Sequence, residues 1–139
     1  MSDARLERER EDPPRGGTAS LRLATGPLVG PVLCRVVSMV LARANCPMDR
    51  LDDAMLICDA LSAHAPEHAR DGHLAFALSA SPGEFELRLS ELAEQAAPEL
   101  VRESVLPGVG NVLERMADSL RIEPAADGRA DELVLELRF

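Results

Sequence analysis

The sequence is almost without aromatic residues. Among its 139 residues there is no tryptophan, no tyrosine and only three phenylalanines. Because 46% of the residues are hydrophobic, the chain can still build a core, and that core must be mainly aliphatic. Proteins that bind single-stranded nucleic acid commonly stack its bases on aromatic rings, and this chain lacks the rings for such a surface.

The sequence also lacks clusters of basic residues. Lys and Arg together number 15 against 24 Asp and Glu, which gives a formal net charge of -9 at pH 7. A polyanion would meet net repulsion from such a chain. We therefore expect no nucleic-acid partner.

Long apolar runs and paired cysteines are missing too. No apolar stretch approaches the roughly 20 residues that span a bilayer, and the N-terminus has no apolar signal-peptide core. The three cysteines, Cys34, Cys46 and Cys58, are an odd number with no CxxC pair. They indicate buried thiols in a reducing compartment rather than disulfides or a zinc site. We expect a soluble cytoplasmic protein with no membrane partner.

The chain divides into a short tail and one domain. Residues 1–18 mix charges of both signs and contain Pro-Pro and Gly-Gly, so they cannot bury apolar area and are predicted to be a disordered charged tail. The remaining length fits one domain with a single core. We expect residues 19–139 to form that domain.

Two helices are predicted in the first half of the domain. Apolar residues repeat at helical spacing from Leu28 to Leu41. The segment from Asn45 to Pro47 breaks this pattern, and Asp49 is a natural N-cap for the second helix. Both helices are expected to bury one side.

The remaining patterns predict strands around a further helical segment. Leu21 and Leu23 alternate with polar neighbours as in a short strand, residues 74–89 and 120–139 each read as a hairpin, and residues 91–119 look helical with an interruption at 106–110. Each strand has one apolar and one polar face, which is typical of an antiparallel sheet covered on one side. The predicted fold is a two-layer α/β sandwich whose mostly antiparallel sheet is covered on one face by helices.

Residues 64–68 read HAPEH, which has the spacing of a zinc-peptidase motif. Zinc binding requires His64 and His68 on one face of a continuous helix. Pro66 lies between them, removes a helical hydrogen bond and disfavours helical geometry at Ala65. The helix is therefore expected to end at Ala65, with His64 in its last turn and His68 in the loop beyond. Carboxylates that could complete a zinc site are plentiful downstream, but none is singled out, so we expect no metal site and keep a zinc hydrolase as an outlying alternative.

The helix at residues 51–69 carries a resemblance to a known family. Its sequence, LDDAMLICDALSAHAPEHA, together with the order of elements, resembles the anti-sigma-factor serine kinases of the histidine-kinase-like ATPase superfamily. The resemblance covers about 120 residues by element order and is specific mainly in this helix. It implies the α/β sandwich of that superfamily, in agreement with the fold predicted above. The positions that match outright are Leu51, Asp52, Asp53, Leu56, His68 and Ala69.

The resemblance implies a nucleotide site whose key residues are missing here. The family's Glu orients and deprotonates a nucleophile, and its Asn one turn later holds Mg²⁺; the matching positions are Ala60 and His64. Where the family has an adenine-reading Asp followed by glycines, the chain has Glu91 and no nearby glycine. The last glycine box survives as Gly108 and Gly110, which a helix-start turn also explains. We expect these five positions to be vestiges, with no catalytic residue, bound cofactor or metal.

The first functional hypothesis is therefore a regulatory protein-binding module that resembles an anti-sigma factor or a partner-switching serine kinase. The resemblance implies a sigma factor or a STAS-type anti-anti-sigma factor as partner, and a tendency to homodimerise. The acidic surface suits a basic partner. The alternative is an ATP-binding serine/threonine kinase that acts on an anti-anti-sigma partner, with ATP and Mg²⁺ held in a rearranged pocket by His64, Glu91 and the LPGVG loop at 106–110.

Overall fold

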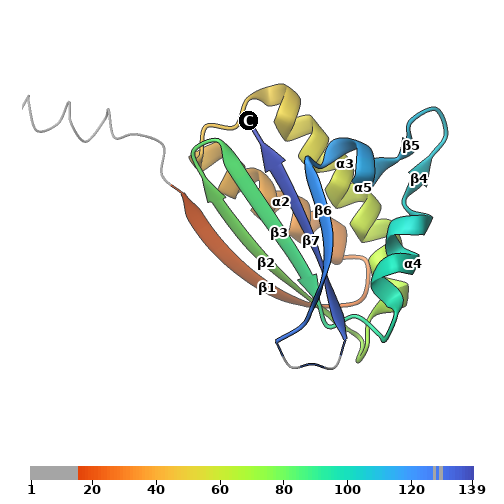
Figure 1. The fold of residues 1–139 in the computed structure, drawn as a ribbon. Helices are drawn as coiled ribbons and strands as arrows, with labels where there is room; N and C mark the ends of the chain where they lie inside the picture. Colours follow the sequence, from red (N-terminus) through yellow and green to blue (C-terminus); the bar gives the residue numbers. More distant parts are fainter. Residues whose placement is uncertain (1–15, 127, 129) are drawn as a thin grey trace, which may run out of the picture.

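The structure is a computed structural model that describes residues 16–126, 128 and 130–139. Figure 1 shows a curved sheet in one layer and the helices in the other. In chain order the elements are β1 (Gly17–Ala24), α2 (Val29–Arg43), α3 (Met48–His64), the 3-10 helix η1 (Ala65–His68), β2 (His73–Ser81), β3 (Glu84–Ser90), α4 (Ala96–Glu103), β4 (Val105–Leu106), β5 (Gly110–Asn111), α5 (Val112–Met116), β6 (Ser119–Pro124) and β7 (Asp131–Arg138).

The main sheet has five strands in the order β1-β2-β3-β7-β6, and each pairing among them is antiparallel. Side chains of β2 and β3 alternate between buried and more exposed positions because successive residues of a strand point to opposite faces. The buried set faces the helices, which cover one side of the sheet (Figure 1). The predicted two-layer α/β sandwich is confirmed.

The core lies between the sheet and helices α2 and α3. It is aliphatic apart from two phenylalanines, as the composition predicts. Among the described helices, none is long and apolar enough to cross a membrane. The largest fully buried side chains are Phe76, Phe85, Leu33, Leu41, Ile57, Leu61, Leu74, Leu78, Leu87, Leu89, Leu92 and Leu100.

Two predicted boundaries in the first half need correction. β1 begins at Gly17, inside the segment predicted as tail, because Gly17 and Thr18 pair with β2. α3 begins at Met48, directly after Pro47, so Asp49 lies in the first turn rather than at the N-cap. Residues 1–15 of the predicted tail lie outside the described residues.

The segment 91–119 is less helical than predicted. Helices α4 and α5 are both short, and the β4-β5 hairpin lies between them. Figure 1 shows this hairpin projecting beyond α4, away from the main sheet. The predicted interruption at 106–110 is therefore the tip of a small hairpin, since Leu106 pairs with Gly110.

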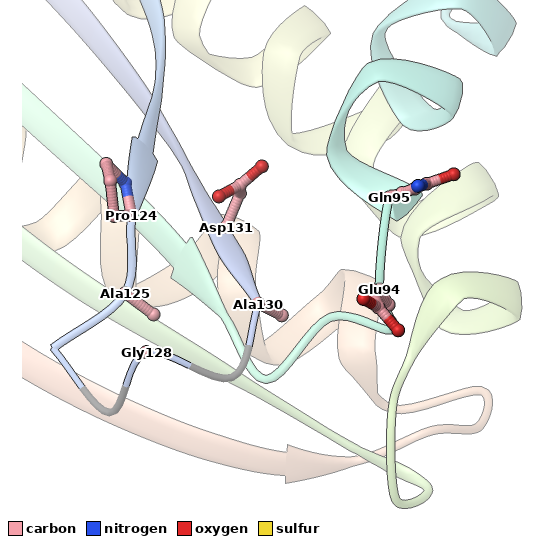
Figure 2. A pocket seen from close by; sticks show the side chains of 7 residues that line it. All are labelled: Glu94, Gln95, Pro124, Ala125, Gly128, Ala130 and Asp131. Carbon is pink, nitrogen blue, oxygen red and sulfur yellow. The ribbon is translucent and has the colours of Figure 1, made fainter.

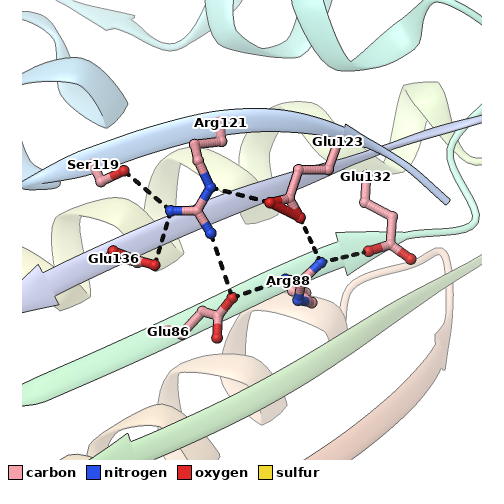
Figure 3. A network of polar contacts seen from close by, with 7 residues as sticks. All are labelled: Glu86, Arg88, Ser119, Arg121, Glu123, Glu132 and Glu136. Carbon is pink, nitrogen blue, oxygen red and sulfur yellow. Dashed lines mark hydrogen bonds and ion pairs between the residues drawn. The ribbon is translucent and has the colours of Figure 1, made fainter.

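An apolar residue is also buried on the sheet face that the helices leave open. Val134 of β7 is 0% exposed, although its neighbours in the strand face the core. Arg88 of β3 and Arg121 of β6 are its register partners on either side. Their guanidinium groups donate hydrogen bonds to surrounding glutamates: Arg88 to Glu123 (2.9 Å) and Glu132 (3.1 Å), and Arg121 to Glu136 (2.8 Å) and Glu123 (3.1 Å), as drawn in Figure 3. The arginine stems thus cover Val134 while the charged ends stay at the surface.

We expect Val134→Ala to lower the free energy of unfolding by about 1–2 kcal/mol, because it removes two buried carbons and leaves a gap under the arginines. Urea denaturation measures this change. Ala77→Ser, on the same open face, is the control and should change stability by less than about 0.5 kcal/mol. An unchanged midpoint for Val134→Ala would contradict the burial of this side chain.

Candidate functional site

The two histidines of HAPEH lie beside one carboxylate. Nε2 of His68 is 2.9 Å from Oε1 of Glu103, and Nδ1 of His64 is 3.9 Å from Oε2 of the same residue. Glu103 is the last residue of α4. The sequence did not indicate this contact, because Glu103 is 35 residues from His68 and no local spacing relates them.

The α-helix ends as predicted, with His64 in its last turn and Ala65 as its C-cap, but Pro66 does not push the residue before it out of helical geometry. Ala65 keeps helical geometry (φ -63°, ψ -36°), and the chain continues from α3 directly into η1. His68 therefore belongs to a 3-10 turn rather than to a loop. The reason is that a proline fits the first positions of a new helical turn, where its missing N–H has no partner to lose.

The shared contact with Glu103 does not make a metal site. Within the part of the chain that the structure describes, no group of three His, Cys, Asp or Glu side chains is arranged to hold a metal ion. The arrangement links η1 to the end of α4 through the hydrogen bond between His68 and Glu103, with His64 at the end of α3 close to the same carboxylate. The zinc-hydrolase alternative gains no support from it.

Glu91 begins the loop that joins β3 to α4, and its side chain turns toward β1. Its carboxylate accepts two hydrogen bonds from Arg22, at 2.8 and 3.0 Å. The hydrogen bond from Arg22 lowers the pKa of the Glu91 carboxyl below its ordinary value, while burial acts in the opposite direction. The carboxylate is thus engaged in an ion pair with β1, which β2 separates from β3 in the sheet.

The same loop has an unusual backbone. Glu91 (φ 62°) and Gln95 (φ 61°) both adopt the left-handed conformation that glycine favours. Such strain persists only where surrounding contacts enforce it. Here the backbone carbonyl of Glu91 accepts a hydrogen bond from the Arg70 amide (2.8 Å), and the Ala93 amide donates to the His68 carbonyl (2.7 Å).

Leu92 closes the space between this loop and the segment after α3. It is 0% exposed, and its backbone bridges to Ala69. In the family that the sequence resembles, the residues that read adenine lie at this loop. Here the loop and the residues after η1 are joined by backbone hydrogen bonds around a buried leucine, so the two segments form one packed unit.

The remaining predicted positions are Ala60, Gly108 and Gly110. They do not come together with His64 and Glu91 in one group of contacting residues. Ala60 is 8% exposed and belongs to the core. Gly108 (φ 80°) lies at the tip of the β4-β5 hairpin. Gly110 (φ 89°) lies against the side chain of Arg115, where an added Cβ would be 3.2 Å from Nε. Both glycines serve a tight turn before α5, as the alternative interpretation of this motif predicted.

A pocket of about 260 Å³ lies near the loop before α4, facing the turn between β6 and β7. Figure 2 shows the carboxylates of Glu94 and Asp131 on its two sides. These groups would repel a phosphate. The described part of this pocket therefore does not favour a nucleotide.

An apolar groove that the sequence did not indicate lies between α4, the β4-β5 hairpin and β6. Its volume is about 550 Å³, and it is lined by Pro98, Val101, Arg102, Val105, Asn111, Glu114, Leu120 and Ile122. Val105 is 55% exposed and Ile122 38% exposed, which is high for large apolar side chains. Among the residues that the structure describes, β6 is an edge strand of the main sheet, and one of its sides pairs with no other strand. An apolar groove beside a free strand edge can accept an extended peptide.

Comparison with known proteins finds a likeness in structure and none in sequence. The chain matches no protein-family model, and a search of curated proteins finds no match either. Among solved structures it is similar to a chain in "The crystal structure of SiaB-SiaC complex from Pseudomonas aeruginosa", with a TM-score of 0.58 and 12% sequence identity, over 100% of this chain and 98% of that chain. At this identity the likeness shows a shared fold, and the similar chain was crystallised in a complex.

Proposed function

We propose that this protein is a regulatory protein-binding module of the partner-switching type, which has kept an interaction surface and lost nucleotide chemistry. The observation that carries the proposal is the apolar groove between α4 and the free edge of β6. The fold shared with a chain of the SiaB-SiaC complex supports it, because that chain was crystallised with a partner.

The groove is suited to a protein partner rather than to a small polar ligand. Val105, Leu120 and Ile122 supply apolar contact area, and β6 supplies backbone groups that a second strand can pair with. Arg102 and Glu114 stand among the lining residues and can fix the orientation of a bound segment. This combination of an apolar centre and a charged rim is typical of protein interfaces.

The loss of nucleotide chemistry is supported by the state of the predicted pocket positions. His64 contacts Glu103, and Glu91 is paired with Arg22. Leu92 is buried between the β3-α4 loop and the residues after η1, which would have to separate to admit a nucleotide. Phosphoryl transfer depends on positioning and on electrostatic stabilisation by Mg²⁺ and its ligands. The residues at these positions provide neither, so we propose a module without catalysis, cofactor or metal.

As the partner we propose a sigma factor or a STAS-type anti-anti-sigma factor, which is what the resemblance of residues 51–69 implies. The net charge of -9 favours encounter with a basic protein and makes association faster at low salt. The apolar groove requires that the partner also offer an apolar segment that is extended or able to become so. We place the protein in the cytoplasm with such a partner.

The experiment is a capture from an extract of the protein's own cells, followed by reconstitution with the captured protein. We expect a sigma factor or a STAS-domain protein, bound through the groove. Ile122→Glu places a charge in the groove and should weaken the reconstituted complex at least about tenfold. Met39→Glu changes an exposed apolar residue on α2 (58% exposed, against 38% for Ile122) and should leave the affinity unchanged.

Two results would overturn the proposal. The first is an affinity that Ile122→Glu leaves unchanged while circular dichroism shows a folded variant. The second is a rise of several degrees in melting temperature with millimolar ATP and Mg²⁺, which would favour the kinase alternative because only a bound ligand stabilises the folded state in this way.

A further inference from the structure

Two of the three cysteines, Cys34 and Cys58, lie where helix α2 packs against helix α3. Cys34 of α2 is partly exposed, and Cys58 of α3 is 1% exposed. The Sγ atom of Cys34 reaches α3, where it lies 3.8 Å from Oδ1 of Asp59, the residue next to Cys58. Cys34 lies one turn after Gly30 in α2 and Cys58 one turn before Ser62 in α3, so the close approach of Gly30 to Ser62 places the two cysteines at facing positions.

Small residues allow the two helices to approach closely at this level. One turn away from the cysteine pair, Gly30 of α2 faces Ser62 of α3, and a Cβ on Gly30 would be 3.3 Å from the Ser62 Cβ. The Ser62 hydroxyl donates to the Cys58 carbonyl (2.6 Å), so it folds back on its own helix. Glycine and serine thus let the two helices approach closely beside the cysteines, and a disulfide between helices requires a close approach.

The two thiols differ in their surroundings. The hydrogen bond from Cys58 lowers the pKa of the Cys34 thiol, against the opposing effects of burial and of Asp59. The same hydrogen bond raises the pKa of Cys58, and burial raises it further. Because Cys34 is partly exposed and Cys58 is buried, Cys34 is the sulfur that an oxidant in solution can reach first, and Cys58 stays beside it as a thiol.

We propose that Cys34 and Cys58 form a reversible redox pair, in which a peroxide oxidises Cys34 and Cys58 resolves the product as an intramolecular disulfide between α2 and α3. In the first step the Cys34 sulfur attacks a peroxide oxygen, the O–O bond breaks, and one water leaves as the sulfenic acid forms. In the second step the Cys58 sulfur attacks the Cys34 sulfur, the S–O bond breaks, and the Cys58 proton leaves with the hydroxyl as a second water. Two thiols lose two electrons in total, and the peroxide gains them.

This pair provides a chemistry separate from partner binding. The sequence indicated only buried thiols, because cysteines 24 positions apart give no local signal of contact. The disulfide would tie together the two helices that cover the sheet and stabilise the fold by restricting the unfolded chain.

The test treats the purified, reduced protein with equimolar hydrogen peroxide, blocks remaining thiols by alkylation, and maps the peptides by mass spectrometry. We expect a peptide pair linked through Cys34 and Cys58, an alkylated Cys46, and a melting temperature several degrees higher that dithiothreitol reverses. In Cys58→Ser the oxidation should stop at sulfenic or sulfinic acid on Cys34. In Cys46→Ser the disulfide should form as in the unchanged protein.

The proposal is overturned if Cys34 and Cys58 are both recovered alkylated after peroxide treatment. It is overturned equally if Cys46→Ser prevents the reaction, since the product would then involve the third cysteine. The measurement requires no partner, so its outcome is independent of the groove and of the proposed function.

Discussion

Phe76→Ala is expected to lower the free energy of unfolding by about 3–5 kcal/mol. Phe76 lies on β2, is 1% exposed, and faces the helices beside Leu21 of β1 and Leu89 of β3. In a chain with only three phenylalanines, the remaining core side chains are mostly leucine, valine and alanine. They are already packed on one another, so they can fill only part of the space that the ring leaves.

A loss of this size matters because a domain of ordinary stability has about 5–15 kcal/mol in total. Denaturation by urea, followed by circular dichroism, measures the change. Phe139→Ala is the matched control, since Phe139 is only partly buried at the end of the chain and packs at the margin of the core. We expect the control to lose clearly less stability. Equal losses for the two variants would show that Phe76 is not at the centre of the core.

The fold was predictable from the sequence because each element buries one side. Residues at helical spacing from Leu28 to Leu41 and alternating residues in β2 and β3 have a period that identifies the element and its buried face. The break at Asn45 to Pro47 separates α2 from α3 as predicted. Boundary errors, such as those at Gly17 and Asp49, arise where the sequence pattern is weak and tertiary pairing decides. The segment 91–119 was also predicted too helical, because the short β4-β5 hairpin within it leaves no clear alternation in the sequence.

The candidate site was less predictable because its contacts join distant segments. The approach of Glu103 to His68 depends on where α4 lies, and α4 follows a loop whose path is set by the left-handed residues Glu91 and Gln95. Neither residue is a glycine, so the sequence gives no sign of that backbone. The groove escaped notice for a similar reason, because Val105 and Ile122 have the same apolar character as core residues and only the structure shows that they are exposed.

The cysteines illustrate the same limit. Their number and spacing predicted three buried thiols, but only Cys58 is buried, whereas Cys34 and Cys46 are partly exposed. The contact between Cys34 and Cys58 arises from the packing of α2 against α3 at Gly30, which a one-dimensional pattern does not contain.

Leu92→Asp is expected to lower the free energy of unfolding at pH 7 by more than about 4 kcal/mol, because it places a carboxylate where Leu92 is 0% exposed. Burial raises the pKa of such a carboxyl, so the charge is lost as pH falls. The stability deficit relative to the unchanged protein should therefore shrink as the pH is lowered from about 7 to about 5. Denaturant midpoints of both proteins across this range provide the measurement.

Leu92→Asn is the matched control, because it has the shape of Asp and no charge to titrate. Its deficit should be smaller than that of Leu92→Asp at pH 7 and constant over the same range. This pair of variants also separates the two functional hypotheses. A loop that opens to admit a nucleotide would expose residue 92 to water and tolerate an aspartate within about 1 kcal/mol, as surface positions do. A large, pH-dependent loss instead requires that the segments around Leu92 and Ala69 stay closed, which contradicts the kinase alternative.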